Sequence, residues 1–198
     1  MCQQGLEHLC REVDGTNYIG FVRNGAYAQY FSGPAKNAYA LPDTVFNEAT
    51  ALIDPLMVAY HAVKHSRITL GSKVLVVGSG IIAQMIGGLA KKMGASYVAM
   101  AKISDVKIAQ SRTIGEFDAY FDETDPTFIE KMQATTAGGF DVAFEAAGAD
   151  LYVKSPSLHC SLSRLSLSCQ YSSPPSQGDR LLAYTPIRRD HEESYVYE

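Results

Sequence analysis

The sequence predicts an α/β fold with a parallel, doubly wound sheet, preceded by a region of short strands and turns. Between residues 66 and 149, apolar β-branched runs alternate with stretches of helical spacing, a pattern typical of a parallel sheet with right-handed crossovers. One such run, VLVVGSGIIAQMIGGL, passes through a pair of glycines directly into a predicted helix. Residues 1 to about 65 instead place Tyr, Phe and Val between Gly, Pro and Asn, which favours short strands.

The predicted elements follow in chain order. Residues 46–65 repeat apolar side chains every three or four positions, and Asp54-Pro55 predicts a kink or a helix start there. The strands expected next are 73–78, 96–101, 118–121 and 141–148, and the helices are 81–94, 104–115 and 126–138. Residues 150–198 are expected to form a divergent or disordered tail, and the serine-rich stretch 155–178 is expected not to pack as a strand.

Composition excludes several classes of protein. The chain has 198 residues, a formal net charge of −4 and no basic stripe, so we expect no nucleic-acid partner. No apolar run is long enough for a membrane span, and the N-terminal MCQQGLEHLC lacks the apolar core of a signal peptide. We therefore expect a soluble, cytoplasmic protein, in which the four cysteines are thiols or metal ligands rather than a disulfide framework.

The glycine turn has the spacing of a dinucleotide-binding site. Gly78-Ser79-Gly80-Ile81-Ile82-Ala83 matches G-x-G-x-x-[GA] between a predicted strand and a predicted helix. The first Gly permits the tight turn, the second lets a pyrophosphate approach the backbone, and small Ala83 lets the helix pack on the strand. The helix N-terminus adds free N–H groups and a positive dipole end for phosphates. The alternative is a tight strand–helix turn that binds nothing.

The position that selects between NAD and NADP holds a cation. In the dinucleotide-binding pattern, an acid at the end of the second strand bonds the adenosine ribose. Here the predicted strand ends at Ala101 and Lys102 follows it, and a lysine favours a 2′-phosphate, hence NADP over NAD. Two alternatives remain open: Lys102 is a solvated side chain, or Asp105 bonds the ribose.

Four segments in order resemble one enzyme family. GAYAQY, NAYALPD, ALIDPLMVAYHAV and GSKVLVVGSGIIA are similar to the zinc-dependent medium-chain alcohol dehydrogenases, especially the polyol, threonine and butanediol branch. The resemblance covers residues 2 to about 149. It implies a remnant of a mostly-β, GroES-like catalytic domain in 1–65, the first half of an NAD(P)-binding Rossmann domain in 66–149, and a tail in 150–198. It also implies hydride transfer between an alcohol or polyol and NAD(P), in a homo-oligomeric parent.

The resemblance further implies zinc, for which this chain supplies few ligands. Cys2 and Cys10 match the last two positions of the family's structural zinc motif, and Asp54 occupies the family's E-P-L-like ligand position. Two thiolates do not close a tetrahedral site, so unpaired thiols are the alternative at Cys2 and Cys10, and helix capping is the alternative at Asp54. His61 and His65 are expected to be structural or solvated.

The remaining zinc ligands of the family would lie before Met1, so we expect this chain alone not to oxidise alcohols. Glu145, near Gly148, resembles a strand end on the nicotinamide side, where it either contacts the cofactor or caps the sheet. The competing interpretations of the whole chain are a non-catalytic dinucleotide-binding module and an inactive truncated product.

Overall fold

The chain divides into two compact units, Met1–Phe46 and Asn47–Glu198. The computed structural model describes residues 19–20, 24–102, 109, 111–112, 117–122, 124–136, 139–147, 162–168 and 186–188. In the first unit, residues 24–46 form turns, bends and the 3-10 helix η3 (Ala35–Asn37). The short strands expected there are therefore wrong for 24–46, because a strand needs a hydrogen-bonded neighbour and these residues have none among those described.

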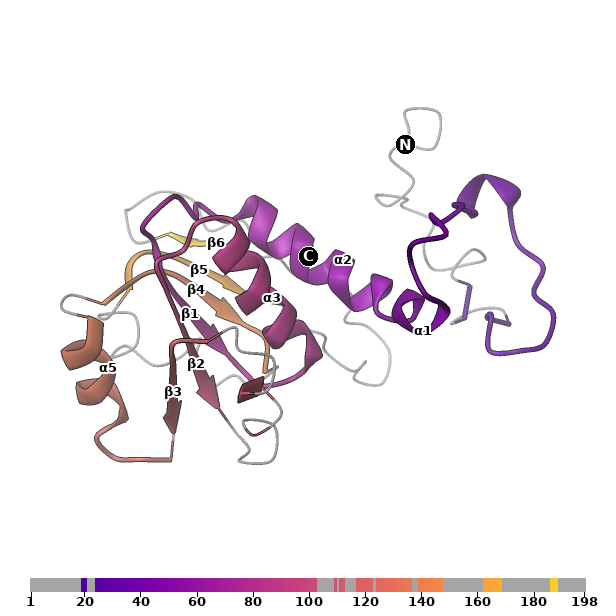
Figure 1. Cartoon of the computed structure of the whole chain (residues 1–198). Coiled ribbons are helices and arrows are strands. Elements are labelled where there is room, and N and C mark those ends of the chain that lie inside the picture. Colours follow the sequence, from indigo (N-terminus) through magenta and orange to yellow (C-terminus); the bar gives the residue numbers. More distant parts are fainter. Residues whose placement is uncertain are drawn as a thin grey trace. The chain divides into compact units, whose positions relative to one another are not determined.

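A sheet of parallel strands forms the centre of the second unit (Figure 1). Its strand order is β3-β2-β1-β4-β5-β6; the first five strands are parallel, and β6 runs antiparallel to β5. The predicted α/β fold is confirmed. The strands are β1 (Lys73–Val77), β2 (Tyr97–Lys102), β3 (Ala119–Asp122), β4 (Phe140–Glu145), β5 (Leu162–Ser168) and β6 (Pro186–Arg188).

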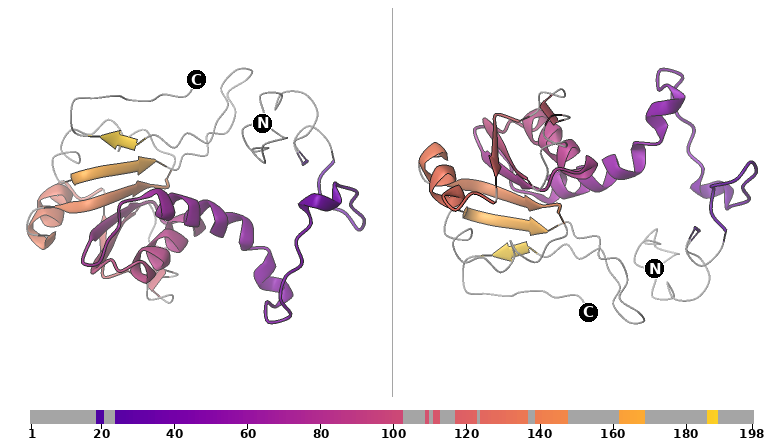
Figure 2. Two further views of the ribbon diagram at one scale, coloured as in Figure 1. Left: turned by 90° about the horizontal axis from the view of Figure 1, so that it is seen from above. Right: turned by 90° about the horizontal axis from the view of Figure 1, so that it is seen from below.

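Helices cover both faces of this sheet (Figures 1 and 2). On one face, α2 (Ile53–His65) and α3 (Ile81–Lys92) pack against residues such as Val74 and Val76 of β1. On the other face, α5 (Phe128–Thr136) packs against the alternate residues Leu75 and Val77. A strand buried on both faces reads as a continuous apolar run, which explains the sequence KVLVV.

The predicted helix boundaries agree with the structure where it describes them. The 46–65 region contains α1 (Asn47–Thr50) and then α2, which begins at Ile53, so Asp54-Pro55 marks a helix start. Pro55 is tolerated in the first turn, where a backbone N–H has no helical partner. Gly94 follows the end of α3 with φ +100°. Most of the predicted helix 104–115 lies outside the described residues.

One expectation about the tail is wrong. Residues 162–168 form β5, a parallel strand paired with β4 in the register Val142↔Leu165 and Phe144↔Leu167. In the sequence, leucine and serine alternate through 165–168, which is a short period-two pattern that the serine-rich composition concealed. The rest of 155–178 lies outside the described residues.

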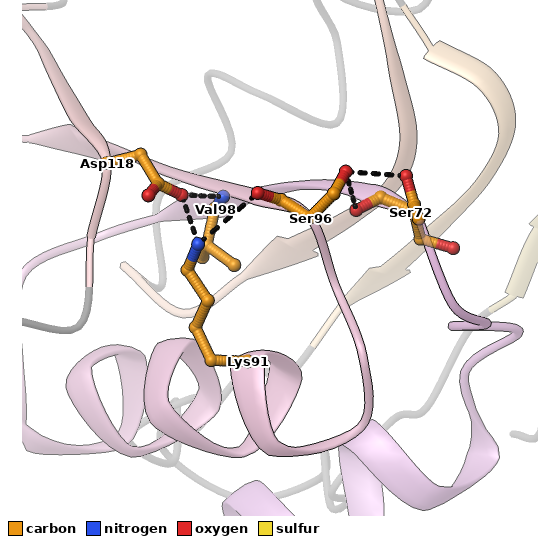
Figure 3. Close-up of polar contacts among 6 residues, drawn as sticks. Ser72, Lys91, Ser96, Val98 and Asp118 are labelled. Carbon is orange, nitrogen blue, oxygen red and sulfur yellow. Dashed lines mark hydrogen bonds and ion pairs between the residues drawn. The ribbon is translucent and has the colours of Figure 1, made fainter.

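Polar groups fix the amino-terminal edge of the sheet, opposite the glycine turn (Figure 3). The Asp118 carboxylate accepts hydrogen bonds from the backbone N–H of Val98 at 2.6 Å and from Nζ of Lys91 at 2.5 Å. The Ser96 hydroxyl donates to the Gly71 carbonyl at 2.7 Å. These bonds tie the start of β2 to α3 and to the segment before β1.

No helix in the described part of the chain is long and apolar enough to cross a membrane.

Candidate dinucleotide-binding site

The first glycine of the turn has a conformation and surroundings that exclude a side chain. Gly78 follows β1 with φ +110°, and its N–H donates to the Ala101 carbonyl of β2 at 2.8 Å. A Cβ at Gly78 would lie 2.8 Å from both the carbonyl carbon and oxygen of Ala146, which follows β4. Left-handed backbone and close approach both require glycine here. The chain therefore turns sharply at the carboxyl end of β1, as the motif predicts.

Gly80 lies at the N-cap of α3 and faces open space. Its φ of −74° and ψ of 177° are accessible to any residue, and a Cβ built there meets no heavy atom within 4 Å. Packing within the chain therefore does not explain this glycine. The first N–H groups of a helix have no intrahelical partner and carry a partial positive charge. Open space before a helix N-terminus fits a bound phosphate group, which approaches closely only when the residue has no side chain.

The rest of the motif positions the turn. Ala83 is fully buried in the core between α3 and the sheet, and a larger side chain would push the helix away from β1. Ser79 is 5% exposed, and its carbonyl accepts a hydrogen bond from Nε2 of Gln84 at 3.2 Å. Ile81 is exposed and Ile82 is half-buried. Gln84 was missed by the sequence pattern, because its role depends on the fold of the turn and not on the glycine spacing.

Three strand ends meet at this edge of the sheet. The register pairs Val77 with Ala101 of β2 on one side and with Glu145 of β4 on the other. Gly78 and Lys102 therefore follow a paired position on adjacent strands, and Lys102 is the last residue of β2. The strand order reverses between β1 and β4, which is where open α/β sheets bind ligands. The alternative ribose residue, Asp105, lies outside the described residues.

Glu145 is a buried carboxylate beside the turn. It is the last residue of β4 and is 7% exposed. Its Oε1 accepts a hydrogen bond from the backbone N–H of Ala147 at 2.7 Å. The carboxylate thus bonds the chain immediately after β4. Gly148 lies outside the described residues.

The described residues do not assemble a zinc site. Within them, no three His, Cys, Asp or Glu side chains lie close enough together to hold a metal ion. Asp54 is exposed in the first turn of α2, and it does not occupy the N-cap, which is Leu52. His61 and His65 lie one turn apart on exposed positions of α2, with ring centroids 4.3 Å apart. Cys2 and Cys10 lie outside the described residues.

Comparison with known proteins agrees with this geometry. The sequence model of the zinc-binding dehydrogenase family matches residues 82–159. L-threonine 3-dehydrogenase from Coxiella burnetii (strain RSA 493) is 31% identical over 147 residues, which cover 74% of this chain and 42% of that enzyme. These matches support the zinc-dependent medium-chain dehydrogenase family for the matched part of the chain. The chain spans less than half the length of the curated relatives that it matches.

Solved structures extend the comparison. A protein named as a zinc-binding dehydrogenase from Sinorhizobium meliloti 1021, bound to NADP, is 31% identical with a TM-score of 0.68. The match covers 77% of this chain and 44% of that protein. Zinc-dependent alcohol dehydrogenase 2 from Streptococcus pneumoniae shares the fold, with a TM-score of 0.71 and 24% identity over 90% of this chain and 51% of its own. The family match continues to residue 159, so the expected end of the resemblance near 149 is too early. No motif in 150–159 marks that continuation in the sequence.

Proposed function

We propose that this chain forms the cofactor-binding part of an oxidoreductase that transfers a hydride between an alcohol or polyol and NAD(P). The observation that carries the proposal is the open space at Gly80, before the first turn of α3, at the point where the strand order reverses. The bound nicotinamide would supply the hydride acceptor. The chain's own contribution is to bind and orient the dinucleotide at the carboxyl edge of the sheet.

Each motif residue has a distinct part in this proposal. The turn Gly78-Ser79-Gly80-Ile81-Ile82-Ala83 would hold the pyrophosphate with backbone N–H groups at the start of α3. Lys102, at the end of the adjacent strand, would pair with the 2′-phosphate of NADP. Solved neighbours bound to NADP and to NADH support a dinucleotide at this site, so the preference for NADP rests on Lys102 alone. Asp54 would give at most one zinc ligand, and the described residues supply no complete set, so the proposal assigns this chain no zinc-dependent step.

The first experiment fills the space at Gly80. We expect the 198-residue chain to bind NADPH in calorimetric titration and Gly80→Val to abolish binding, because the isopropyl group would occupy the phosphate position. The backbone at Gly80 accepts any residue, so the variant should melt within a few degrees of the wild type. Ala134→Val is the control, since it adds two methyl groups at an exposed position near the end of α5, outside the glycine turn. Unchanged binding by Gly80→Val would refute the site.

The second experiment tests the choice of cofactor. Lys102→Asp should weaken NADPH binding more than NADH binding and reduce or reverse the preference, because a charge-assisted hydrogen bond contributes about 1.5–3 kcal/mol. Lys92→Asp changes the net charge equally at an exposed position at the end of α3, and it should leave the preference unchanged. Equal affinities for the two cofactors, with no effect of Lys102→Asp, would show that the 2′-phosphate assignment is wrong.

A further inference from the structure

A carboxylate at the end of an apolar strand is an unusual feature of this edge. The residues of β4 before Glu145, from Val142 to Phe144, are buried, and Glu145 itself is 7% exposed. Burial of a charged group costs free energy unless hydrogen bonds compensate. The Oε1 atom of Glu145 accepts the backbone N–H of Ala147 at 2.7 Å, two residues further along the chain. The buried carboxylate therefore fixes the conformation of its own strand end.

The segment that Glu145 fixes, residues 146–147, packs against the glycine turn. The Ala146 N–H donates to the Val77 carbonyl at 2.8 Å, which joins the end of β4 to the end of β1. A Cβ at Gly78 would lie 2.8 Å from the Ala146 carbonyl and 3.0 Å from the Ala147 nitrogen. Residues 146–147 thus lie directly against the first glycine of the motif. Any shift of this segment changes the space available to the turn.

We propose that Glu145 is a positioning residue for the dinucleotide, acting through Ala146 and Ala147 and not by contact with the cofactor. Its carboxylate holds the Ala147 N–H, which keeps the two alanines against Gly78. The turn is then already in its binding conformation before the cofactor arrives, so binding does not have to order it. This inference rests on the proposed function, because it assigns Glu145 a role in the same site.

Two substitutions separate the hydrogen bond from the charge. Glu145→Gln keeps a carbonyl oxygen that can accept the Ala147 N–H, whereas Glu145→Met has a similar length and no such acceptor. We expect the methionine variant to bind NADPH about tenfold more weakly, as loss of one hydrogen bond to a charged group predicts. The glutamine variant should bind NADPH within about twofold of the wild type. Its side-chain carbonyl keeps a hydrogen bond with the Ala147 N–H, and this neutral bond stabilises the turn only modestly less than the charged one does.

A carboxylate at the other end of the same strand supplies the matched control. Oδ2 of Asp141 accepts the backbone N–H of Lys73 at 2.9 Å, so it makes a comparable bond at the amino edge of the sheet. Asp141→Ala should lower the melting temperature without changing NADPH affinity, which separates loss of stability from loss of positioning. In the wild-type chain, the Ala147 amide should also exchange slowly with deuterium before any NADPH is added.

The outcomes distinguish this inference from the proposed function. If the wild-type chain does not bind NADPH, the proposed function fails and the inference fails with it. If the wild type binds, equal weakening in Glu145→Gln and Glu145→Met, or no weakening in Glu145→Met, overturns the inference alone. Rapid exchange of the Ala147 amide in the unliganded chain also overturns it, even where the methionine variant does not fold. Weak binding by Glu145→Met, with rescue by Glu145→Gln and no effect of Asp141→Ala, supports it.

Discussion

Replacing Gly78 with alanine should destabilise the chain by about 2–6 kcal/mol, for two separable reasons. The φ of +110° is unfavourable for a residue with a side chain, which costs about 1–3 kcal/mol. The new Cβ would also lie 2.8 Å from the Ala146 carbonyl, and overpacking of this kind costs about another 1–3 kcal/mol. The neighbour is backbone of a strand end, so it cannot move away by changing a rotamer.

Two other glycines separate the cost of backbone strain from the cost of the steric contact with Ala146. Gly71 has a φ of +91° and nothing within 4 Å of an added Cβ, so Gly71→Ala should cost only the backbone strain, about 1–3 kcal/mol. Gly80 has neither feature. Gly80→Ala loses a favourable N-cap residue but restricts the unfolded chain, and these opposing effects should leave stability within about 0.5 kcal/mol of the wild type.

Thermal and urea unfolding of the three variants measure these differences. For a chain of this length, 1 kcal/mol shifts the melting temperature by about 2–4 °C, so Gly78→Ala should melt about 4–24 °C lower than the wild type. NADPH titration measures affinity separately from stability, because Gly80→Ala should weaken NADPH binding without lowering stability. Equal destabilisation by Gly71→Ala and Gly78→Ala would show that the contact with Ala146 carries no energy. Strong destabilisation by Gly80→Ala would refute the open space assigned to that position.

Two further predictions concern stability away from the glycine turn. Asp118→Ala should cost about 1–3 kcal/mol in urea unfolding, because it leaves the part-buried Val98 N–H without its acceptor. Lys91→Ala removes a partly exposed ion pair and a long, exposed hydrogen bond to the Ser96 carbonyl, so it should cost under about 1 kcal/mol (Figure 3). Equal costs for the two variants would contradict this. Hydrogen bonds from Lys131 and Thr127 lower the pKa of Asp125 to about 2, so its contribution to stability should be complete above pH 3.8 and lost as the pH falls towards 2. An Asp125 carboxyl titration by NMR checks the value, and the midpoint should rise in Lys131→Ala.

The parts of the fold that the sequence predicted are those determined by local pattern. The run KVLVV, the glycine turn and the helix that follows all depend on neighbours within about a dozen residues, and each lies where the spacing places it. Asp54-Pro55 predicted a kink or a helix start for the same reason, and α2 begins there, since Pro55 is tolerated in a first helical turn.

The parts that the sequence missed lack a clear local pattern. β5 has the mixed sequence LSRLSLS, and its pairing with β4 supplies the backbone hydrogen bonds that this composition did not suggest. Turns replace the expected strands in 24–46, because strand propensity alone does not supply a pairing partner. Local propensity was therefore a sufficient guide for the continuous apolar runs of β1 and β4, and an insufficient one for the mixed sequence of β5.

The candidate site shows the same division between local and distant information. Gly78, Gly80 and Ala83 are three positions of one turn, so their spacing alone carries the prediction of a phosphate site. The role of Glu145 depends on the register that places β4 beside β1, which no spacing in the sequence reveals. A zinc site is more demanding still, because three or four ligands from separate segments must converge within bonding distance. Asp54 alone therefore supports a family resemblance and supplies one ligand of the several that a metal centre needs, whereas the glycine turn has within one loop the features proposed to bind a dinucleotide.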